Sequence, residues 1–119
     1  KSYLGLAVPN DREGALQDIH WSHPSFAIFP GYTIGNLVGA QLMEKVRVDI
    51  PDLDSQIERG QFTTLLGWLR RNVHRHGRKF TPNELMERAT GKPLSAGPWI
   101  AYIQRKFGAL YGLEAVGRR

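Results

Sequence analysis

The residues best suited to chemistry lie in the run from Gly14 to Trp21, which follows the pattern G-x-x-Q-D-x-H-W. Within it, Asp18 and His20 are close enough in sequence to act as a carboxylate–imidazole pair. Such side chains also hold turns together through local hydrogen bonds, and we favour this structural role for the two residues.

The remaining histidines do not form a metal-binding pattern. His74 and His76 are two residues apart, so on a helix they point to different sides. His20 and His23 are better spaced, but Pro24 disrupts any helix there. The chain has no cysteine, and no histidine is followed by glutamate, so the zinc motif H-E-x-x-H is absent. We therefore predict no metal site and no cofactor in this chain.

Hydrophobic periodicity predicts an all-α fold of five or six helices with short loops, forming a single domain over residues 1–119. The clearest amphipathic stripe is formed by Phe62, Leu65, Leu66, Leu69 and Val73, with Trp68 at its edge. Strict alternation is absent, so few or no strands are expected. Helices are expected over about 13–19, 34–46, 52–59, 62–76, 81–90 and 95–110, and Gly77 is expected to end the fourth of them.

Several residue types predict where these helices begin and end. Pro30-Gly31 reads as a break before the second helix. Thr81, Pro82 and Glu84 predict a capping box, and Gly91 a helix stop. Two glycines on the second helix, Gly35 and Gly39, predict close packing against another backbone.

The ordered set of motifs resembles the thermostable (Taq-type) zinc metallocarboxypeptidase family. After the first motif, a stretch running through Phe29-Pro30 and Tyr32 to Gly35-Asn36-Leu37 is similar in the same order. The stretch His74–Arg78 with Thr81-Pro82 follows, and the end of the chain, Leu110–Leu113, also looks similar. The resemblance covers nearly the whole chain.

The resemblance implies a largely helical, usually dimeric enzyme that removes single residues from peptide C-termini. In that family, zinc is held by the two histidines of H-E-x-x-H and a downstream glutamate, and the glutamate of the motif activates water. This apparatus would lie upstream of Lys1, so the chain should resemble the C-terminal portion of such an enzyme and be inactive alone.

The same resemblance places several residues in the substrate groove. Gln17, Asp18, His20 and Trp21 correspond to a groove motif. His76 and Arg78 correspond to a second element, where Arg78 could bind a peptide carboxylate with two hydrogen bonds. Phe80 stands where the family usually has tyrosine, so the hydroxyl is lost.

Charge leaves two other functions open. Residues 61–119 contain 11 basic and 3 acidic side chains, a net of +8, whereas residues 1–60 have a net of −3. A basic nucleic-acid-binding module is one alternative, although the arginine run at 70–79 lacks interleaved aromatic residues for base stacking. A free-standing, truncated, non-catalytic homologue that dimerises or regulates is the other.

The expected partners are a second copy of the chain or the upstream part of the same enzyme, with a peptide as a further possibility. Apolar faces left uncovered in a partial enzyme would favour association into a dimer or higher oligomer, which sedimentation would test. No run of about 20 apolar residues is present, so no membrane span is expected, and we expect a cytoplasmic protein.

Overall fold

The computed structural model describes residues 5–23, 25 and 27–113, apart from the side chains of Trp21 and Ser22. Within these residues every regular element is helical, which confirms the predicted fold class. None of these helices combines the length and the apolar character needed to cross a bilayer. The 3₁₀-helices are η1 (Asp11–Glu13), η2 (Ala15–Gln17) and η3 (His74–His76), and the α-helices are α1 (Ile19–Ser22), α2 (Phe29–Asp49), α3 (Leu53–Glu58), α4 (Thr63–Asn72), α5 (Pro82–Thr90) and α6 (Gly97–Tyr111).

The chain divides into two compact units, one ending at Thr33 and the other beginning at Ile34. In the first unit, the predicted helix over 13–19 is wrong. Asn10 accepts a hydrogen bond from the Glu13 amide, as a helix cap does, but only one 3₁₀ turn follows. Gly14 then has φ −117° and ψ −114°, which no helix accommodates, so the chain makes a second 3₁₀ turn before α1.

The predicted break at Pro30-Gly31 is also wrong, because both residues belong to the first turn of α2. Proline lacks an amide hydrogen, but the first amides of a helix have no partner within the helix. As the second residue of α2, Pro30 therefore costs the helix no hydrogen bond. The break after α1 does occur: that helix ends at Ser22 with His23 extended, and Pro24 lies outside the described residues.

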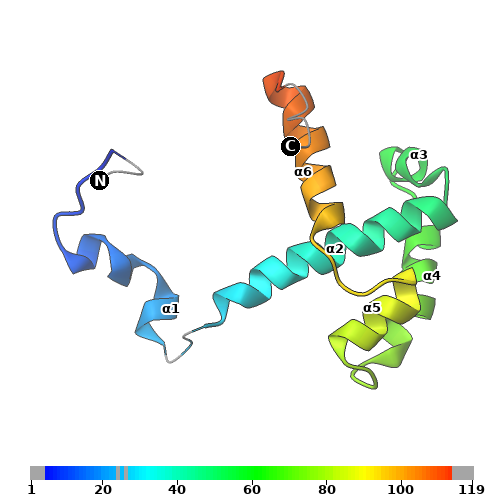
Figure 1. Ribbon diagram of the computed structural model, residues 1–119, viewed down its shortest axis with the longest axis horizontal. Coiled ribbons are helices and arrows are strands. Elements are labelled where there is room, and N and C mark those ends of the chain that lie inside the picture. Colours follow the sequence, from blue (N-terminus) through cyan, green and yellow to red (C-terminus); the bar gives the residue numbers. More distant parts are fainter. Residues whose placement is uncertain (1–4, 24, 26, 114–119) are drawn as a thin grey trace. The chain divides into compact units, whose positions relative to one another are not determined.

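The core of the second unit lies where α3, α4 and α5 meet the C-terminal half of α2 (Figure 1). Burial of the apolar side chains at this meeting point is the main force that holds the four helices together. The predicted stripe of α4 is partly misplaced, because Trp68 is 4% exposed whereas Phe62 is 54% and Leu66 is 39% exposed. The buried residues of this core cluster are Val46, Ile50, Leu53, Trp68 and Ala89, with Leu42, Met43, Ile57, Leu65, Leu69 and Val73 packed against them.

The ends of α5 agree with the sequence. The Glu84 amide donates to the Thr81 hydroxyl, and the Thr81 amide donates to the Glu84 carboxylate, which together form the capping box. Gly91 ends the helix in the left-handed conformation at φ 76°. Before α6, the Ser95 hydroxyl accepts a hydrogen bond from the Gly97 amide.

Gly35 and Gly39 do not pack against another backbone, contrary to expectation. A Cβ atom built at either position would meet no atom within 4 Å in the described structure. Both residues instead line a groove between α2 and α6.

Substituting Gly39 with alanine should therefore stabilise the protein by about 0.5–1 kcal/mol, because alanine favours a helix and no clash opposes it. The matched substitution Gly91→Ala should destabilise by about 1 kcal/mol, since alanine is strained at positive φ. Urea denaturation followed by circular dichroism would check both signs. A destabilised Gly39→Ala variant would mean that an unseen contact fills this space.

Candidate functional site

A chain of three polar side chains forms the candidate site of the first unit. The Asp18 carboxylate Oδ1 lies 2.6 Å from Nδ1 of His20, and Nε2 of His20 lies 3.1 Å from the Tyr32 hydroxyl. His20 thus joins a residue just before α1 to one in the first turns of α2. The Phe29 ring packs against the imidazole, with 4.7 Å between ring centroids.

Asp18 has two roles at this site. As the N-cap of α1, its Oδ1 also accepts the His20 backbone amide at 2.9 Å, so the expected structural hydrogen bond is present. Accepting from Nδ1–H selects the tautomer whose Nε2 is a bare acceptor, and Tyr32 then donates its hydroxyl proton to that nitrogen. Asp18 therefore orients the imidazole and assigns the direction of both hydrogen bonds.

The pKa of Asp18 is lowered, first by the hydrogen bond from the His20 backbone amide and then by the one from its ring. Because the folded pKa lies below the unfolded one, the stabilising contribution is present above the unfolded pKa and is lost as the pH falls through the folded pKa.

An NMR titration of the Asp18 carboxyl carbon should give a midpoint below its ordinary value of 3.8. In an Asp18→Asn variant, the cap acceptor remains but this pH-dependent loss should disappear. Unchanged acid sensitivity of the α1 amide signals in that variant would contradict the assignment.

The other residues of the first motif have different surroundings. The exposed Gln17 side chain donates to the Arg12 carbonyl at 2.6 Å and so closes the turn. Trp21 lies in α1, and its side chain is outside the described part of the structure. Tyr32 was not among the candidates, because no local pattern predicts that a residue 12 positions away contacts His20.

The second element surrounds Gly77, which follows η3 at φ 55°. The His76 ring is half-buried, and its centroid lies 5.2 Å from the centroid of the Phe80 ring. Arg78 is exposed and makes no ion pair within the described residues. A free guanidinium on a tight turn is suited to binding a carboxylate.

The donor set does not suit zinc. Across the described ranges, no three histidine, cysteine, aspartate or glutamate side chains converge on one point. His74 and His76 are held in a 3₁₀ turn rather than four apart on one helix face.

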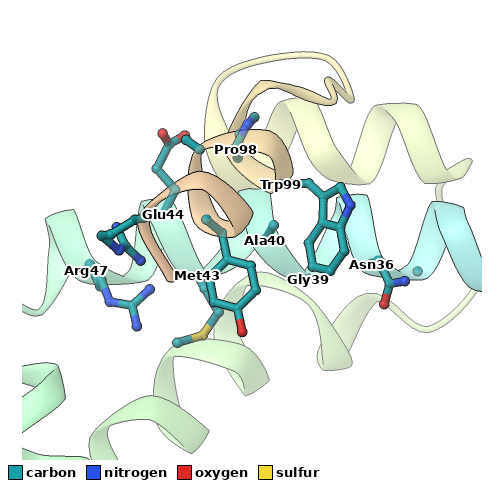
Figure 2. A pocket seen from close by; sticks show the side chains of 12 residues that line it. Asn36, Gly39, Ala40, Met43, Glu44, Arg47, Pro98 and Trp99 are labelled. Carbon is teal, nitrogen blue, oxygen red and sulfur yellow. The ribbon is translucent and has the colours of Figure 1, made fainter. Parts of the chain in front are cut away.

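A groove of about 540 Å³ runs between α2 and α6. Figure 2 shows Pro98 and Trp99 from α6 beside Gly39, Ala40 and Met43 of α2. Trp99 stacks on Tyr102, with ring centroids 5.5 Å apart. Neither His76 nor Arg78, the predicted substrate-groove residues of this unit, lines it.

The family model of carboxypeptidase Taq (M32) metallopeptidases matches residues 1–107 of the 119. The chain belongs to this family. Membership confirms the resemblance drawn from the motifs around His20 and His76. It also agrees with the helical fold, since M32 carboxypeptidases are the structural neighbours described below.

Two carboxypeptidases of bacterial origin illustrate the relationship. Thermostable carboxypeptidase 1 of Thermus thermophilus is 40% identical over 112 residues, which cover 94% of this chain and 22% of that protein. Carboxypeptidase 1 of Bacillus subtilis is 39% identical over 111 residues, covering 93% and 22%. The M32 chain thus spans about a fifth of these relatives, and the matching region is their C-terminal part.

Solved structures agree with the sequence match. The crystal structure of the M32 carboxypeptidase from Deinococcus radiodurans R1 superposes with a TM-score of 0.83 at 50% identity, over 94% of this chain and 23% of that one. The Pyrococcus furiosus carboxypeptidase gives 0.79 at 38% identity, over 89% and 21%.

Proposed function

We propose that this M32 chain supplies part of the substrate groove of a zinc metallocarboxypeptidase and does not hydrolyse peptides by itself. The observation on which the proposal rests is the Asp18–His20–Tyr32 chain, which lies within and just after the motif G-x-x-Q-D-x-H-W. Its relatives are carboxypeptidases, which supports a peptide as the bound molecule.

In this proposal Asp18 is a positioning residue, and His20 and Tyr32 contact the peptide. The Tyr32 side chain is exposed, so its hydroxyl can turn from His20 to a peptide carbonyl or amide. His20 then accepts or donates at Nε2 according to its protonation state. The Phe29 ring beside it provides apolar contact for a peptide side chain.

Arg78 is proposed to bind a peptide carboxylate through two parallel hydrogen bonds. Its exposure and lack of an acidic partner in the described structure support this role. Phe80 close by has no hydroxyl, so any polar help from a tyrosine at this position is lost.

The proposed inactivity of the isolated chain follows from the sequence, which contains no H-E-x-x-H among its 119 residues. Peptide hydrolysis by this family's mechanism needs a metal ion, coordinated by protein side chains, that polarises the amide and activates water. Rigorously purified protein incubated with zinc and short peptides should release no C-terminal residue in an amino-acid assay.

Chelator-sensitive release of the terminal residue would overturn this proposal. Groove binding has its own readout in the same sample, because the NMR signals of the His20 ring should shift when a short peptide is added. In the control variant Asp18→Asn, the carboxylate that orients the His20 ring is lost, so the shift should be smaller. Absence of any shift at saturating peptide would remove the groove role while leaving the inactivity untouched.

A free-standing homologue that self-associates is the second candidate function. It is favoured by the large apolar side chains exposed on α6, where Ile100 is 50%, Leu110 is 66% and Tyr111 is 67% exposed. Exposed apolar patches on one helix promote association. We propose a dimer or higher oligomer, and a monomer in sedimentation at micromolar concentration would contradict it.

A further inference from the structure

A second site with its own chemistry surrounds Phe80. The Arg88 guanidinium carbon lies 4.2 Å from the centroid of the Phe80 ring, and Nζ of Lys79 lies 5.7 Å from it. The His76 ring packs against the same phenyl group at 5.2 Å. We call these four residues the Phe80 cluster: three nitrogen-bearing side chains held around one aromatic ring.

The positive charge of the Phe80 cluster is not neutralised locally. Residues 75–92 contain five basic and two acidic side chains, a net of +3. Neither Arg88 nor Lys79 forms an ion pair with any described residue. Glu84 interacts electrostatically with Arg88 without forming an ion pair, because its Oε2 accepts from the Thr81 amide and hydroxyl, each at 2.8 Å, to close the cap of α5.

The geometry of Arg88 suits a carboxylate. Stacking on a ring fixes the plane of the guanidinium and leaves its edge N–H groups free to donate. A carboxylate accepts two such bonds side by side. Phe80 therefore acts as a rigid support that lowers the entropy Arg88 loses when it binds an anion.

Nucleic acid fits this surface less well than an acidic peptide does. Proteins that bind single strands offer aromatic faces to the bases. The Phe80 ring is half-buried and already contacted by Arg88, Lys79 and His76.

We propose that the Phe80 cluster is a docking surface for an acidic peptide segment of a partner protein. Carboxylates of the partner pair with Arg88 and Lys79, and Arg75 and Arg78 on the adjoining turn extend the positive surface. This surface adjoins the second groove element and shares His76 and Arg78 with it, whereas Arg88 and Lys79 belong to the docking surface alone. The anisotropy of an acidic peptide therefore tests Arg88 and Phe80, and the His20 signals test the groove, so failure of one proposal can be told from failure of the other.

The test is titration of the 119-residue protein with a fluorescent octaglutamate peptide, followed by anisotropy at low and at physiological salt. Arg88→Gln and Phe80→Leu should each weaken binding about threefold to fivefold, as expected for one or two surface ion pairs. Phe80→Tyr keeps a ring beneath Arg88 and should bind like the original protein. Arg105→Gln removes one charge from α6 and should change affinity less than twofold.

Circular dichroism melts of each variant separate lost binding from lost folding. Weakening confined to Arg88→Gln and Phe80→Leu, together with loss of binding as salt rises, would support the proposal. No binding of octaglutamate at low salt would overturn it. Equal weakening by Arg105→Gln, or tighter binding of a single-stranded DNA octamer than of octaglutamate, would overturn it as well.

Discussion

Replacing Trp68 with alanine should lower the free energy of unfolding by about 3–5 kcal/mol. Trp68 is 4% exposed and lies in the core with Val46, Ile50 and Leu53, so its removal leaves a cavity between α2, α3 and α4. The indole Nε1–H also donates to the Asp49 carboxylate at 2.8 Å, and this bond is lost too. Urea denaturation of the two proteins, monitored by circular dichroism, measures the difference.

Two control variants separate the causes. Trp68→Phe keeps most of the apolar volume and removes the indole donor, so it should cost clearly less than alanine. Leu66→Ala on the same helix removes a side chain that is 39% exposed and should cost about 1 kcal/mol or less. Equal losses for Trp68→Ala and Leu66→Ala would show that the core does not centre on Trp68.

The hydrogen bond to Asp49 has a consequence for pH. The pKa of Asp49 is lowered, first by its hydrogen bond with Lys45 and then by that with Trp68. The folded pKa is depressed, so this stabilisation exists above the unfolded pKa and is lost as the pH falls through the folded value. Trp68→Phe should thus reduce the loss of stability that occurs on acidification.

Replacing Gln41 with leucine should lower the free energy of unfolding by about 2–3 kcal/mol. Gln41 is 2% exposed, and its amide joins α2 to the connection between α5 and α6. Its Nε2 donates to the Thr90 hydroxyl and to the carbonyl of Pro93, while its Oε1 accepts from the Ser95 amide at 2.9 Å. Leucine fills a similar volume but removes the partner of the Pro93 carbonyl and of the Ser95 amide, whereas the Thr90 hydroxyl still donates to the Met86 carbonyl.

Gln56→Leu is the matched control for this prediction. The Gln56 side chain donates to the Asp52 carboxylate, four residues earlier and one helical turn away. Losing this local hydrogen bond should lower the free energy of unfolding by about 0.5 kcal/mol or less. Hydrogen exchange adds a local readout, because the Ser95 amide should exchange faster in Gln41→Leu alone. An unchanged Ser95 rate would mean that water or another residue replaces the Gln41 carbonyl.

The sequence by itself determined the features that depend on neighbouring residues. The capping box at Thr81 and Glu84, the stop at Gly91 and the helical class all follow from local hydrogen bonding and backbone preference. The family followed from motifs in order along the chain, around His20 and His76, since such motifs need no knowledge of contacts.

Only the tertiary structure decided which residues meet across the chain. Tyr32 contacts His20 across 12 positions of the chain, and Gln41 contacts Ser95 across 54. Trp68 is buried and Leu66 exposed, although both suit an apolar face, because the placement of α2 and α3 decides which side of α4 is covered. The physical reason is the same in each case: helical periodicity defines the faces of a helix, but packing partners select the face that is buried.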